Sequence, residues 1–199
     1  MQIRMRKWFA CCLVATLVLM AYPAAAIEVE PSPEQIQAAL EKGKEQAEKG
    51  GSPDGLYVRF GADDDLHPSG FLITKLSALS VMATHMALRG LEPTSADITQ
   101  VLETPTMLVS TVIFGNVPPF AVDSYMVFDQ GGKTIKPVTV RFDGQANRSK
   151  AWPDPPRFKA KVVASFNYAD FDPTAKTTIA VFPMSGCEVS FPLDFAKIN

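Results

Sequence analysis

The segment Phe158–Phe166, with the sequence FKAKVVASF, decides the fold class of this chain. Its alternating apolar positions are Phe158, Ala160, Val162, Ala164 and Phe166, and Lys159, Lys161 and Ser165 lie between them. Because successive side chains of a β-strand point to opposite faces, this alternation predicts a strand with one buried and one exposed face. The chain is therefore expected to contain a sheet with a hydrophobic core on one side.

Segments on both sides of this strand also have strand character. Met107–Phe114 is apolar on both faces, as expected of a central strand that is covered on each side. Further strands are expected at residues 124–128, 134–142, 177–182 and 188–193, the last two as a hairpin around Met184–Gly186. Six strands at this spacing, or seven with a short candidate at 56–60, predict an antiparallel β-sandwich-like sheet.

The chain before Pro105 has helical periodicity instead. Ser32–Gln35 contains a capping box and a proline suited to the first helical position, which predicts a helix to about Lys49. Its apolar stripe is narrow, so this helix is expected to pack loosely on the domain or on a partner. A second helix is predicted from Phe71 or Lys75 onward, and its broad apolar surface indicates burial.

A third, short helix is expected after a cap at Thr94 or Ser95. Helices first and strands afterwards place the chain in the α+β class. Residues 27–199 are numerous enough for one domain, with an expected helical part at 32–104 and a β part at 106–195.

The first 26 residues have the three parts of a signal peptide. Arg4, Arg6 and Lys7 are basic, residues 8–20 are apolar and uncharged, and Ala24–Ala26 supplies small residues for cleavage. The apolar stretch is too short to cross a hydrocarbon core of about 30 Å as a helix. We therefore expect export and a periplasmic or secreted location without an integral membrane anchor. A retained anchor is the alternative.

Cleavage would leave Cys187 as the only cysteine, so no intramolecular disulfide is expected. The remaining chain has 16 basic and 21 acidic residues, a net charge of −5. No cluster of Lys and Arg is present, which argues against nucleic acid as a partner.

The segment Asp63–His67, with the sequence DDDLH, is the most chemically charged part of the chain. Asp63, Asp65 and His67 could hold a divalent cation, because carboxylates and imidazole are metal ligands. The spacing matches neither a calcium loop nor a zinc site, so a solvated acidic turn is the favoured interpretation. His85 is the other histidine, and its helix predicts a core or boundary position.

No catalytic motif is found elsewhere. Neither Ser69 nor Ser185 has the glycine spacing of a hydrolase nucleophile, and Cys187 is interpreted as a packing residue. The sequence has no glycine-rich phosphate loop, so no cofactor is expected.

Two proline-rich loops are the better candidates for a binding site. Trp152 lies in the sequence AWPDPP of residues 151–156, and Phe120 ends the sequence VPPF of residues 117–120. A large aromatic side chain on a rigid loop can anchor an interface. The alternative is that both rings fold back and cover the ends of the sandwich.

Three stretches are similar to those of uncharacterised bacterial exported proteins: IQAALEKG at residues 36–43, YVRFG at 57–61 and VSFPLDF at 189–195. The resemblance spans most of the chain after the signal peptide. It implies export and one compact domain, and it carries over no activity and no site residue.

The function expected from these features is that of an exported, non-enzymatic envelope or secreted protein. It would act through a binding surface on another envelope protein, either alone or as an accessory subunit. A metal-dependent or hydrolase-like enzyme that uses His67 and the adjacent aspartates is one alternative. A purely structural envelope module is the other.

Overall fold

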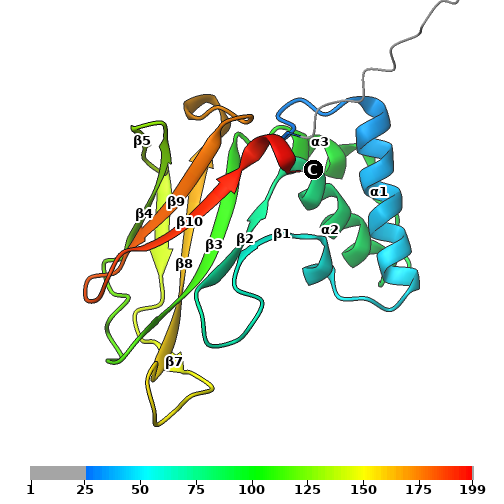
Figure 1. Ribbon diagram of the computed structural model, residues 1–199. Coiled ribbons are helices and arrows are strands. Elements are labelled where there is room, and N and C mark those ends of the chain that lie inside the picture. Colours follow the sequence, from blue (N-terminus) through cyan, green and yellow to red (C-terminus); the bar gives the residue numbers. More distant parts are fainter. Residues whose placement is uncertain (1–25, 199) are drawn as a thin grey trace, which may run out of the picture.

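The computed structural model describes residues 26–198 and confirms the α+β class. The predicted signal peptide lies outside the described residues, apart from Ala26. The described helices are α1 (Pro33–Glu48), α2 (Lys75–Ala87) and α3 (Ser95–Leu102). Figure 1 shows them grouped on one side of a β-sandwich.

The sandwich consists of two antiparallel sheets. The first has six strands in the order β1-β2-β3-β8-β6, with β7 also paired to β8. Its strands are β1 (Val58–Gly61), β2 (Ser69–Ile73), β3 (Thr106–Gly115), β6 (Thr139–Phe142), β7 (Asn147–Arg148) and β8 (Phe158–Asn167). The second sheet has the order β10-β9-β4-β5. Its strands are β4 (Tyr125–Gln130), β5 (Lys133–Ile135), β9 (Lys176–Phe182) and β10 (Val189–Asp194).

Aromatic rings join the two sheets in the core. Phe128 on β4 stacks on Phe166 of β8, with ring centroids 3.6 Å apart. Phe171 and Phe195 meet the edge of Phe128, each with a centroid distance of 5.6 Å. Phe166 belongs to the alternating segment that predicted a half-buried strand, and the buried face of that segment is this core.

The β region begins earlier than predicted. Residues 69–73 form strand β2, whereas the predicted helix could begin at Phe71, inside the helical part at 32–104. Leu72 is fully buried in the sandwich core, and Thr74 caps α2 by accepting a hydrogen bond from the Ser77 amide. Leu72 lies at helical spacing from the leucines of α2, so the sequence pattern extends the predicted helix into β2. The helix itself begins only after its N-terminal cap at Thr74. The strands β1 and β2 therefore belong to the β part.

The predicted strand at 134–142 is divided between the sheets. Residues 133–135 pair with β4 as β5, and residues 139–142 pair with β8 as β6. Pro137 lies between them, and proline cannot donate a hydrogen bond to a sheet. The chain changes sheets at this proline.

Helix α1 packs tightly on α2, so the prediction of loose packing was wrong. The Ser32–Gln35 capping box is present, as predicted. Ala39 and Gly43 are buried against α2, where a side chain at Gly43 would meet the Ser80 carbonyl oxygen and Ala83. The hydroxyls of Ser80 and Thr84 donate to the carbonyls of Ala39 and Gly43, both at 2.8 Å. Small residues let the helix backbones approach, so a narrow stripe suffices to fix α1.

No helix in residues 26–198 is long and apolar enough to cross a membrane. Cys187 is free and exposed, so the described part of the chain contains no disulfide. The interpretation of Cys187 as a packing residue was therefore wrong.

Candidate binding surface at one end of the sandwich

Four connections meet at one end of the sandwich, which we call the loop end: residues 62–68, 116–124, 143–157 and 183–188. The strand register brings them together, because Gly61 pairs with Ser69 and Gly115 with Phe158. The start of β4 likewise pairs with the end of β9. In Figure 1 these connections lie in the lower part of the view, away from α3.

Contacts between the loops join them into one surface. Lys150 pairs with Asp65, which links loops 143–157 and 62–68. The Ala146 amide donates to the Pro118 carbonyl at 3.0 Å, and the Ser185 amide donates to the Phe120 carbonyl at 3.4 Å. Loop 116–124 is thus hydrogen-bonded to loop 143–157 and to loop 183–188. Together with the ion pair, these contacts connect all four loops.

Each of the four loops exposes one large apolar side chain. Nine such side chains are exposed in the described part of the chain, and four of them are Leu66, Val117, Trp152 and Met184. Tyr125 and Phe142, at strand ends beside the loops, are two more. Exposed apolar residues that gather on one surface indicate an interaction site, whereas scattered ones need no explanation.

Trp152 is exposed and yet held in position. Its side chain is 41% exposed, and its ring meets the edge of Phe158 with centroids 5.4 Å apart. The Arg148 guanidinium lies 4.6 Å from the centroid of the indole ring. These contacts hold the ring in place without covering it. The ring is therefore neither free in solvent nor buried over the end of the core.

The Trp152 loop is a compact turn held by its own hydrogen bonds. Ser149 organises it: the Ser149 hydroxyl donates to the Pro156 carbonyl and accepts from the Ala151 amide. The Ser149 amide donates to the Arg157 carbonyl at 2.8 Å. A turn that satisfies its own polar groups can present the Trp152 ring at little entropic cost on binding.

Phe120 is not part of this surface, so the prediction for it was wrong. Its side chain is only 1% exposed and belongs to the core. The ring packs directly against Gly115, where a Cβ atom would collide with it. The absence of a side chain at Gly115 makes room for the ring, and Val117 is the large apolar residue that this loop exposes instead.

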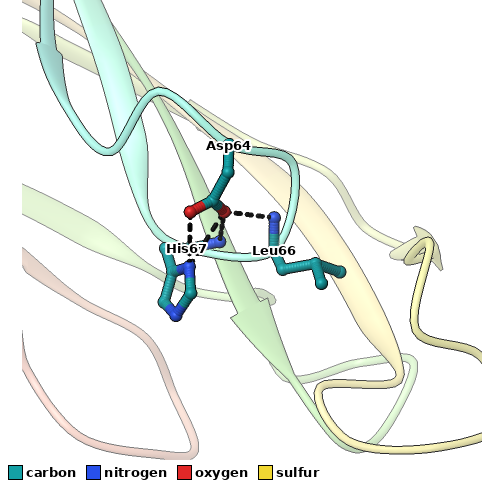
Figure 2. Close-up of polar contacts among 3 residues, drawn as sticks. All are labelled: Asp64, Leu66 and His67. Carbon is teal, nitrogen blue, oxygen red and sulfur yellow. Dashed lines mark hydrogen bonds and ion pairs between the residues drawn. The ribbon is translucent and has the colours of Figure 1, made fainter.

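The acidic segment forms a turn stabilised by Asp64, which the metal prediction did not include. The Asp64 carboxylate accepts from the amides of Leu66 at 2.8 Å and His67 at 2.9 Å (Figure 2). It also lies 2.7 Å from Nδ1 of His67. The Leu66 amide, followed by His67, holds the pKa of Asp64 below its usual value. This carboxylate therefore serves the local turn.

The predicted metal ligands Asp63, Asp65 and His67 are not brought together as a ligand set. Asp65 pairs with Lys150, which lowers the pKa of Asp65, and His67 pairs with Asp64. In residues 26–198, no group of three or more His, Cys, Asp or Glu side chains is placed to hold a metal ion. The geometry thus favours a solvated acidic turn that is tied to the Trp152 loop by its ion pair.

His85 is exposed in the last turn of α2, so the expectation of a core or boundary position was wrong. Within the described residues, the histidine side chain that makes a polar contact is His67, and its partner is Asp64. The hydrogen bonds of residues 26–198 therefore do not pair a serine or cysteine nucleophile with a histidine base.

Of the four exposed large apolar residues of the loop end, Trp152 was predicted from the sequence and the other three were missed. For Leu66 and Met184 the signal was the same as for Trp152: a single large apolar residue in a polar or proline-rich connection. The loop of Val117 also contains Phe120 and Val122, so its sequence does not single out Val117. Compared with protein-family models, curated proteins and solved structures, the chain shows no significant match.

Proposed function

We propose that this chain is an exported, non-enzymatic protein of the bacterial envelope that binds another envelope protein through its loop end. The observation that carries the proposal is that four connected loops each leave one large apolar side chain exposed: Leu66, Val117, Trp152 and Met184. Such a surface combines apolar contact area with a fixed backbone, and interfaces obtain most of their binding energy from a few side chains of this kind.

The charges around these residues favour a protein partner over a nucleic acid. The four loops together contain seven carboxylates and only three cationic side chains, Arg148, Lys150 and Arg157, so the loop end carries excess negative charge. Nucleic-acid sites require a basic surface, whereas a protein interface commonly has an apolar centre with a polar rim of mixed charge.

Export is supported by the basic, apolar and small-residue parts of the first 26 residues. The intact mass of the protein isolated from the cell envelope or the medium should correspond to a chain that begins at Ile27. A full-length mass would contradict this half of the proposal.

Site-specific photo-crosslinking in the native cell envelope tests the binding half. A benzoylphenylalanine residue at position Val117 or Met184 should crosslink the same envelope protein, because both positions lie on the loop end. Val138 is the matched control position, since it is an exposed valine at the opposite end of β6. A crosslink from Val138 to that protein, with none from the two loop positions, would contradict the proposal.

A further inference from the structure

A second surface lies on the helical side of the molecule, on elements that the loop end does not use. A groove of about 560 Å³ runs along α1, beside the C-terminal end of α2 and the turn that follows it. Its wall on α1 is formed by Gln37, Leu40, Glu41, Lys44, Ala47 and Glu48. These positions recur at helical spacing, so they form one continuous stripe along the helix.

The length of the groove along α1 suits another helix. Between Gln37 and Glu48 the stripe is about 16 Å long, which corresponds to roughly three helical turns. The α1–α2 contact fixes this geometry, because Ala39 and Gly43 hold α1 against α2 along the buried side of the same helix.

The groove is also lined by small and by large apolar residues. Ala47, Ala83 and Ala87 leave space between the helices. Leu88 and Leu91 border this space at the end of α2, and they are 55% and 54% exposed. Alternation of small and large residues forms the holes into which leucine-sized side chains of a partner helix insert.

The rim of the groove carries excess negative charge. Glu41, Glu48 and Glu92 line it together with a single lysine, Lys44. Lys44 Nζ lies 3.4 Å from the Glu92 carboxylate and offsets that charge. Among residues 26–198, Glu41 and Glu48 have no ion-pair partner, so the rim favours an occupant with basic residues beside its apolar face.

We propose that this groove binds an amphipathic helix with basic flanks that belongs to a partner protein. A second copy of this chain fits less well. The described helix with basic flanks is α2, between Lys75 and Arg89, and it already packs against α1 through Ser80 and Thr84. Helix α1 has more acidic than basic residues, while α3 has Asp97 as its charged residue. The proposal is independent of the loop end.

Two synthetic helical peptides test the groove directly. Each has about 14 residues, the length of roughly four turns, with the same leucine face and either lysine or glutamate at the remaining positions. Binding to the mature protein is measured by fluorescence anisotropy. The lysine peptide should bind at least about tenfold more tightly than the glutamate peptide, because only it complements the rim.

Variants of the protein assign the binding to the groove. Leu88→Ser combined with Leu91→Ser should weaken the binding of the lysine peptide by about tenfold or more, since both large exposed apolar side chains of the groove are lost. Glu41→Gln combined with Glu48→Gln should weaken it by roughly threefold and reduce its salt dependence. Val138→Ser is the matched control, and it should leave the affinity unchanged because Val138 does not line the groove.

Three results would overturn the proposal. Equal affinity for the two peptides would show that charge does not select the occupant. Affinity that is unchanged in the Leu88→Ser, Leu91→Ser variant would place binding elsewhere. A concentration-dependent dimer that this variant abolishes would identify a second copy of the chain as the occupant.

Discussion

The α1–α2 junction and the loop end differ in their side chains: the junction buries small residues, and the loop end exposes large apolar ones. At the junction, Ala39 and Gly43 are buried beneath the hydroxyls of α2, so close backbone approach replaces large apolar side chains. At the loop end, large apolar side chains remain exposed on a backbone that hydrogen bonds already fix. This difference indicates that the residues that stabilise the fold are not the residues that we propose to bind a partner. Substitutions at the junction should destabilise the fold strongly, and substitutions at the loop tips should change its stability little.

Phe120→Ala should give the largest loss of stability, about 4 kcal/mol, because the truncation leaves a cavity in the core. The residue lies in a loop, but its ring is buried over Gly115. Urea unfolding of the variant measures the loss. A change below about 1 kcal/mol would be typical of a surface residue and would contradict the buried position.

Gly43→Val should destabilise the junction by about 3 kcal/mol, because the added side chain overpacks the α1–α2 contact. A Cβ atom at this position collides with the Ser80 carbonyl. Gly144→Val is the matched control, since a Cβ atom there meets nothing within 4 Å. If thermal or urea unfolding shows equal losses for the two variants, α1 does not pack as described.

Trp152→Ala should cost only about 1 kcal/mol of stability, the size expected for losing one aromatic pair and one exposed cation–π contact. The loop keeps its shape through the hydrogen bonds of Ser149 and Arg157. Urea unfolding of this variant, beside Phe120→Ala, separates an exposed loop aromatic from a buried one. A loss of about 4 kcal/mol would show that Trp152 is a core residue.

Asp64→Asn should produce the smallest effect, and that effect should depend on pH. Hydrogen bonds from the Leu66 amide and then from the His67 side chain depress the pKa of Asp64 in the folded chain. The stabilisation by the ionised carboxylate is therefore present above its ordinary pKa and is lost as the pH falls through the depressed value. Unfolding curves of the wild type and the variant should differ slightly at neutral pH and converge in acid. A constant difference across that range would show that ionisation of Asp64 is irrelevant.

Local patterns predicted those elements whose own residues determine them. The alternation in Phe158–Phe166, the capping box at Ser32 and the hairpin around Met184–Gly186 all appear where the sequence placed them. Each depends on neighbours within a few residues. Phe71–Ile73 was ambiguous because Leu72 continues the leucine spacing of α2, and only its pairing with β3 decides that it is a strand.

The candidate surface could be predicted only in part, because distant residues complete it. Trp152 was found from its prolines, but the partner of Asp65 is Lys150, which is 85 residues away in the chain. The burial of Phe120 likewise depends on the missing side chain of Gly115, which a pattern of apolar residues does not reveal. Contacts between loops follow from strand register, and register is set by the whole sheet.

The central claim is that Trp152 marks the binding surface, and fluorine NMR of a fluorotryptophan-labelled chain tests it most directly. After loss of the first 26 residues, Trp152 is the only tryptophan, so the free protein should give one signal. Its chemical shift should change when water is replaced by heavy water, as expected of an accessible ring. Addition of the crosslinked envelope partner, unlabelled, should move the signal and remove its solvent sensitivity, because the partner covers the ring. A complex in which the signal keeps its position and its full solvent sensitivity would contradict the account.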